Sequence, residues 1–101
     1  MTQDRITVVI DADLEELIPD FLKNRVTDLE KLKKSSDASD FQSIRSIGHS
    51  LKGVGGGYGF MKITELGAEL EKSAKESDID TIKRCISELQ NYLEKLDIRF
   101  E

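Results

Sequence analysis

The chain has no tryptophan, one proline (Pro19), one cysteine (Cys85) and one histidine (His49) among its 101 residues. Because proline breaks helix interiors, a single proline permits long helices through most of the chain. A lone cysteine cannot form an internal disulfide, and no apolar run of roughly 18 residues is present to cross a membrane. The acidic residue near the start of the chain, followed by only a short apolar stretch, does not fit a signal peptide. From these absences we expect a cytoplasmic protein without a membrane segment.

Basic residues are fewer than acidic ones, with 15 Lys and Arg against 20 Asp and Glu, and the formal net charge is −5. Nucleic-acid binding depends largely on Lys and Arg that neutralise phosphates, so we do not expect a nucleic-acid partner. The composition, 38% hydrophobic and 35% charged, is typical of a soluble helical protein. The length fits one domain over residues 1–101 with a single core.

Hydrophobic periodicity predicts helices through most of the chain. A β-branched run at 6–10 is expected to lie in an extended arm over 1–12, because a lone strand has no partner. A short helical turn follows from Asp13, which opens a capping-box-like pattern with Glu16. Pro19 suits the first turn of the next helix, which ends in the polar stretch 33–39.

Three further helices are predicted over 39–58, 60–76 and 77–100. Two of them begin at capping boxes, Ser39-x-x-Gln42 and Ser77-x-x-Asp80. Short connections favour antiparallel neighbours. We therefore predict an all-α fold, an antiparallel up-and-down four-helix bundle over 13–100 with a short N-terminal helix or arm.

Apolar positions mark the face that each helix is expected to bury. In the last helix they run from Ile79 to Phe100 at spacings of three and four, and Cys85 beside them is expected to be a small buried hydrophobe. The expected core positions of the other helices are Leu22, Val26, Leu29, Leu32, Phe41, Ile44, Ile47, Leu51, Val54, Tyr58, Ile63, Leu66, Leu70 and Ala74.

Glycine is concentrated in residues 48–60, which hold six of the seven glycines in the chain. Each glycine inside a helix costs about 1 kcal/mol relative to alanine, so close packing or access by a partner must compensate. On a helical wheel, Gly48 and Gly55 share the apolar face, where tight helix packing explains them. His49 falls on the opposite, solvent-exposed face. Six residues lie around it: Gln42, Arg45, Ser46, Lys52, Gly53 and Gly56.

Nucleotide-binding glycine motifs do not account for this segment. The phosphate-binding pattern G-x-x-x-x-G-K-[ST] fails at Tyr58 or Val54, depending on its start, and the dinucleotide pattern G-x-G-x-x-G fails at Tyr58. No buried strand precedes either. Three acids at 65, 69 and 71 are interpreted as surface charge, and no carboxylate cluster is expected on the His49 face. We therefore predict no metal and no cofactor.

The stretch His49-Ser50-Leu51-Lys52-Gly53 resembles the H-x-L-K-G signature of histidine-containing phosphotransfer (HPt) domains, and residues 65–71 resemble the helix that follows it in that family. The resemblance runs from about residue 14 to 96. It implies that His49 is the phosphoacceptor, that Lys52 lies beside the phosphoryl oxygens, and that Gly53 leaves room for the phosphate. It also implies a phosphocarrier and not an enzyme.

The function that follows is a phosphorelay intermediate, which takes a phosphoryl group from an aspartyl phosphate on a receiver domain and passes it to another receiver. A neutral imidazole can attack phosphorus, while Lys52 and Arg45 offset charge on the phosphoryl oxygens. The Mg²⁺ and catalytic acid groups are expected on the receiver. The expected partners are response-regulator receiver domains or a hybrid histidine kinase. We expect the chain to bind them as a monomer.

Docking is expected over Gln42, Arg45, Ser46 and Gly56, with two weaker candidates on the next helix at positions 62 and 65. An alternative is a non-phosphorylated adaptor that binds a signalling partner through the same face. A third possibility, the dimerisation and phosphoacceptor part of a histidine kinase, needs an ATP-binding domain for which this sequence has no room.

Overall fold

In the computed structural model, residues 4–101 are described; residues 1–3 of the expected arm lie outside this part. Within these residues the chain is mostly helical, with four long helices. In order the elements are β1 (Ile6–Ile10), the 3-10 helix η1 (Ala12–Leu17), α1 (Ile18–Asp37), α2 (Phe41–Gly55), the 3-10 turn η2 (Gly56–Tyr58), α3 (Met61–Lys75), α4 (Ile79–Lys95) and β2 (Leu96–Phe100).

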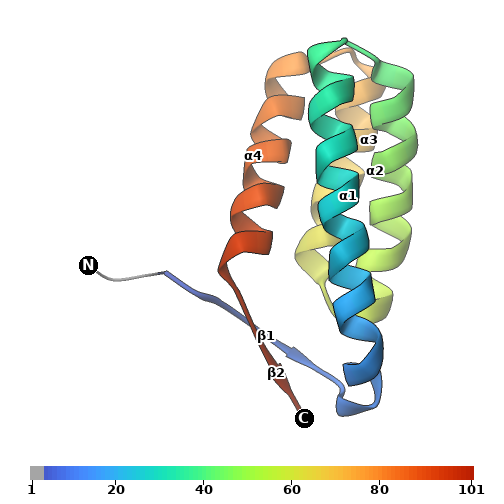
Figure 1. The fold of residues 1–101 in the computed structure, drawn as a ribbon. Coiled ribbons are helices and arrows are strands. Elements are labelled where there is room, and N and C mark those ends of the chain that lie inside the picture. The colour runs from blue at the N-terminus through green and yellow to red at the C-terminus, as the bar shows by residue number, and fades with distance from the viewer. Residues whose placement is uncertain (1–3) are drawn as a thin grey trace.

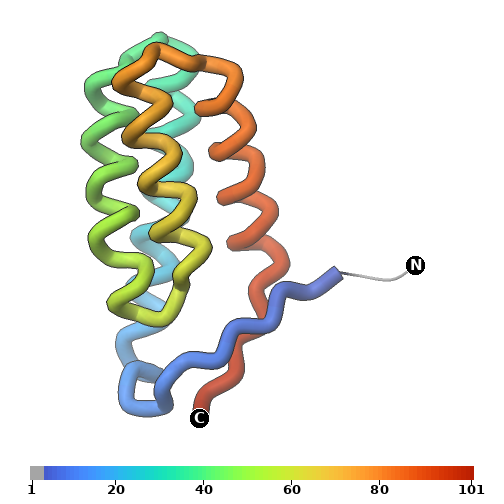
Figure 2. Tube along the Cα trace, turned by 180° about the vertical axis from the view of Figure 1, so that it is seen from behind, coloured from blue at the N-terminus to red at the C-terminus, as the bar shows by residue number. Residues whose placement is uncertain are grey.

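The four long helices lie side by side (Figure 1). The α1–α2 and α3–α4 connections are at one end of the molecule, and the α2–α3 connection is at the other (Figures 1 and 2). The two strands lie near that second end (Figures 1 and 2). None of the helices within residues 4–101 has the length and apolar character needed to cross a membrane.

The two strands pair in parallel, with Ile6 opposite Leu96 and Ile10 opposite Phe100. The expected arm therefore has a strand partner, and the helical prediction for residues 96–100 was wrong. The α4 helix ends at Lys95, and Leu96 already has extended backbone angles. In β2 apolar residues alternate with Asp97 and Arg99, which is the period of a strand. Its last apolar positions also fit a helical spacing, so periodicity alone favoured continuing the helix.

Two aspartates cap the helices that follow the tight connections. Asp40 accepts hydrogen bonds from the backbone N–H of Ser43 (3.1 Å) and from its hydroxyl (2.6 Å). Asp78 accepts the same two bonds from Thr81, at 3.2 and 2.6 Å. These hydrogen bonds lower the pKa of both carboxyl groups. Both aspartates satisfy N–H groups that the first helical turn leaves free.

The predicted capping boxes thus began one residue too early. Ser39 and Ser77 have φ angles of 51° and 52°, in the left-handed region. That conformation is typical of the residue that closes a preceding helix, so the next residue becomes the cap. The earlier short turn is a 3-10 helix capped by Asp11, whose side chain accepts from the N–H of Asp13.

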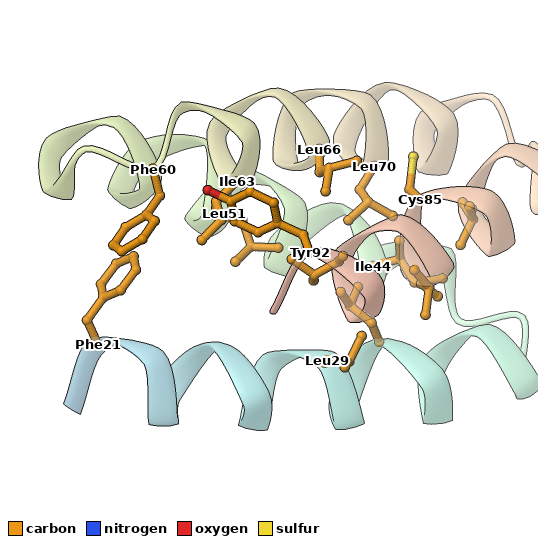
Figure 3. Packing of buried hydrophobic residues seen from close by; sticks show 14 of the residues in the cluster. Phe21, Leu29, Ile44, Leu51, Phe60, Ile63, Leu66, Leu70, Cys85 and Tyr92 are labelled. Atoms are coloured by element: carbon orange, nitrogen blue, oxygen red, sulfur yellow. The ribbon is translucent and has the colours of Figure 1, made fainter. Parts of the chain in front are cut away.

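The core lies between the helices, where aliphatic side chains from α2, α3 and α4 meet those of α1 (Figure 3). At one end, the ring of Phe21 stacks on Phe60 at 5.2 Å between centroids. The predicted core positions of α3 are all buried, and so is Cys85. Tyr92 joins them, although the sequence pattern did not include it.

One predicted core position of α1 was wrong, because Val26 is 46% exposed. The buried face is set by Phe21, Leu29 and Leu32, and Arg25 occupies the intervening position. Its guanidinium lies over the Phe21 ring, 4.7 Å from the centroid, and pairs with Asp28 at 3.0 Å. A charged residue can therefore take a buried position here, because an aromatic face and a carboxylate surround it.

Candidate functional site

His49 lies in the middle of α2 with its side chain 73% exposed. This is the solvent-facing position that the helical wheel predicts. The six residues predicted around it, Gln42, Arg45, Ser46, Lys52, Gly53 and Gly56, are exposed as well. On the other side of the helix Gly48 and Gly55 are buried, as predicted.

The imidazole is held by a carboxylate from the neighbouring helix. Nδ1 of His49 lies 3.0 Å from Oε2 of Glu71 on α3, and Nζ of Lys52 lies 3.5 Å from the other oxygen, Oε1. The hydrogen bond from His49, assisted by the charge of Lys52, lowers the pKa of the Glu71 carboxyl. Glu71 is therefore ionised at neutral pH.

An ionised carboxylate can only accept hydrogen bonds, so Nδ1 of His49 must carry the proton. In the neutral ring the other nitrogen, Nε2, then has a free lone pair. Because the side chain is mostly exposed, Nε2 is available to a group that approaches from solvent. The contact with Glu71 therefore orients the ring and leaves Nε2 as the nitrogen that faces an approaching group.

Two glycines make this arrangement possible by letting α2 and α3 approach closely. A Cβ atom added to Gly48 would lie 2.8 Å from the backbone nitrogen of Glu71 and 2.9 Å from the carbonyl oxygen of Gly67. One added to Gly67 would meet the carbonyl oxygen of Gly48 at 2.7 Å. No side chain fits between these backbones. Since Gly48 precedes His49, the contact brings Glu71 beside the imidazole.

The predicted docking residues separate into two groups around the ring. Gln42, Arg45 and Ser46 line a shallow hollow together with His49 and Glu71. On the other side of the ring, along α2 toward its C-terminus, Gly53 has open space where a side chain would begin. Gly56 lies further on, and a Cβ there would be 3.2 Å from Sδ of Met61. The two weaker candidates, Lys62 and Glu65, are exposed on α3 and do not line the hollow.

Glu71 is the residue that the sequence analysis missed, and its interpretation as surface charge was wrong. The glycines of the sequence did indicate this contact, because Gly67 precedes Glu71 by one helical turn and Gly48 adjoins His49. Facing glycines on adjacent helices indicate a close crossing. The other two acids differ: Glu69 pairs with Arg84 on α4, and Glu65 is exposed. Among residues 4–101, no three His, Cys, Asp or Glu side chains come together to hold a metal ion.

One comparison with known proteins found a family. A family model described as Hpt domain matches residues 16–98, nearly the whole chain. The matched range includes His49, Lys52 and Glu71. Searches of curated proteins and of solved structures found no match.

Proposed function

The chain belongs to the Hpt domain family, a family of phosphocarrier modules in two-component signalling, and we propose that it is a phosphorelay intermediate. It accepts a phosphoryl group on His49 from the aspartyl phosphate of a receiver domain and passes the group to another receiver. The observation that carries this proposal is the imidazole itself, exposed and hydrogen-bonded through Nδ1 to Glu71.

The transfer begins with in-line attack by Nε2 of His49 on phosphorus. The Nε2–P bond forms as the P–O bond to the receiver aspartate breaks, and the aspartate leaves as a carboxylate. The ring gains positive charge in this step while Nδ1 keeps its proton. The ionised Glu71, 3.0 Å from Nδ1, stabilises that charge. Transfer to the next receiver reverses the same bond changes.

The position of each residue beside the His49 ring suggests its role in the transfer. Lys52, half exposed and held near Glu71, can reach the phosphoryl oxygens with its ammonium group. The open space at Gly53 admits the phosphoryl group and the receiver backbone. Gln42, Arg45 and Ser46 bind the receiver on the N-terminal side of the ring. Gly56 binds it on the C-terminal side, beyond Gly53. Arg45 offsets part of the phosphoryl charge.

The partners of this surface are receiver domains of response regulators or of a hybrid histidine kinase. The Mg²⁺ and the acid groups that activate the aspartyl phosphate belong to the receiver. We propose that the chain acts as one domain, a monomer with an antiparallel up-and-down bundle; the alternating positions of the helix connections support that topology (Figure 2). A cytoplasmic location stays a prediction.

The test is incubation with a receiver domain carrying a labelled aspartyl phosphate. We expect label on the chain as an acid-labile, base-stable adduct, and none on His49→Gln. Circular dichroism of the variant should match wild type, because an exposed side chain contributes little to folding. If wild type binds the receiver without taking label, and His49→Gln binds equally well, the protein is an adaptor.

A further inference from the structure

A threonine side chain is inserted at the end of α2. The hydroxyl of Thr64, on the first turn of α3, accepts a hydrogen bond from the backbone N–H of Gly56 (2.7 Å). The same hydroxyl donates to the carbonyl oxygen of Lys52 (3.0 Å). Lys52 and Gly56 are four residues apart, which is the spacing of one hydrogen bond in an α-helix. Thr64 therefore bridges the two backbone groups that an uninterrupted helix would join directly.

Gly55 makes room for this insertion. A Cβ atom at Gly55 would lie 2.7 Å from the backbone nitrogen of Thr64 and 2.8 Å from its hydroxyl oxygen. The glycine is thus needed for a specific polar contact and not only for apolar packing. Beyond the inserted hydroxyl, α2 stops and the chain turns as η2. Side chains inserted between helical hydrogen-bonding groups are a known cause of such local changes.

Lys52 therefore contacts α3 through its backbone and through the end of its side chain. Its carbonyl oxygen bonds to Thr64, and its ammonium nitrogen lies 3.5 Å from Glu71. Its backbone nitrogen is also close to α3, because a Cβ at Gly67 would collide with it. These contacts fix where the lysine side chain starts relative to the His49 ring.

We propose that Thr64 is a positioning residue for phosphotransfer, acting through the backbone of Lys52. This inference rests on the proposed function, because it concerns the lysine expected beside the phosphoryl group. Without the hydroxyl, the last turn of α2 is free to close its own hydrogen bond. The Lys52 side chain then starts from a different place and meets the transferring oxygens less well.

The test measures single-turnover transfer from a phosphorylated receiver over a range of receiver concentrations. Thr64→Val keeps the side-chain shape and removes both hydrogen bonds. We expect it to lower the maximal rate roughly threefold to tenfold, the effect of about one lost hydrogen bond, with a smaller change in the half-saturating concentration. Thr64→Ser, which keeps the hydroxyl, should restore the rate to within about twofold.

A matched control and a double variant separate positioning from a general structural effect. Thr27 on α1 also donates its hydroxyl to a helix carbonyl, that of Lys23 (3.3 Å) in the same helix. Thr27→Val should transfer at the wild-type rate. In a Lys52→Ala background, Thr64→Val should have almost no further effect on the maximal rate, because its effect passes through the lysine.

Hydrogen exchange of the Gly56 amide gives a readout independent of activity and of variant folding. The amide should be protected in wild type, and in Thr64→Ser, by its bond to the hydroxyl. The inference fails if the wild-type Gly56 amide exchanges freely, if Thr64→Val transfers at the wild-type rate, or if its effect is unchanged in Lys52→Ala. A wild-type protein that takes no label would instead overturn the proposed function, and this inference with it.

Discussion

Replacing Gly67 by alanine tests whether the close helix crossing builds the site. The added methyl would lie 2.7 Å from the carbonyl oxygen of Gly48 and 2.9 Å from the carbonyl carbon of Leu51. Ordinary contacts between carbon atoms are at about 3.5–4.0 Å, so α2 and α3 must separate by roughly 0.5–1 Å. The obstructing atoms are backbone and cannot rotate away.

The expected loss of stability follows from two opposing effects. Overpacking lowers the free energy of unfolding by about 1–3 kcal/mol, and collisions with backbone atoms lie at the upper end of that range. The better helix propensity of alanine raises it by about 1 kcal/mol. We therefore expect Gly67→Ala to lower the free energy of unfolding by about 2 kcal/mol. In a domain of this size that lowers the melting temperature by roughly 8–16 °C.

Separation of the helices should also release the imidazole. The distance from Nδ1 of His49 to Glu71 is 3.0 Å, and an added 0.5–1 Å (roughly the separation above) takes it beyond hydrogen-bond range. Nitrogen NMR of the histidine ring should then show a mixture of the two neutral tautomers, where wild type shows Nδ1 protonated.

The matched control is Gly53→Ala, the same substitution on α2 at a position with no atom within 4 Å of the new methyl. It should raise the free energy of unfolding by up to about 1 kcal/mol and leave the tautomer unchanged. The reasoning is refuted if Gly67→Ala melts at or above wild type, or if it melts lower while the ring keeps its single tautomer.

Two further predictions concern buried and ionised groups. Burial raises the pKa of the Cys85 thiol to about 12. An aromatic disulfide reagent at pH 8 should therefore leave the thiol unmodified in the folded protein and modify it in urea. Rapid modification without urea would contradict this prediction. Glu71 has a pKa below the ordinary 4.5, so its contribution to stability is present above that value and is lost as pH falls through the lower, folded-state pKa. Acid titration followed by circular dichroism should show that the stability advantage of wild type over Glu71→Gln shrinks below pH 4.5. An advantage that grows as the pH falls below 4.5 would contradict the pair described here.

Features that depend on local sequence were predicted well. The four helices, the exposure of His49 and the burial of Gly48 and Gly55 all follow from the period of one helix. The strand β2 was not predicted, because its partner β1 lies 90 residues away and the apolar positions at its end also fit a helix. The caps were misplaced by one residue because the serines before Asp40 and Asp78 end one helix and do not begin the next.

The position of Glu71 shows why the site could be predicted only in part. A helical wheel places residues around one axis, but whether a side chain of α3 reaches α2 depends on the distance between the two axes. That distance is set by Gly48 and Gly67, which allow the backbones to touch. A crossing with ordinary side chains, at about 8–10 Å between axes, would hold the carboxylate farther from the ring. The helical wheel could therefore identify His49 as the nucleophile. Glu71, which determines the nitrogen that carries the proton, could be identified only from how closely the helices pack.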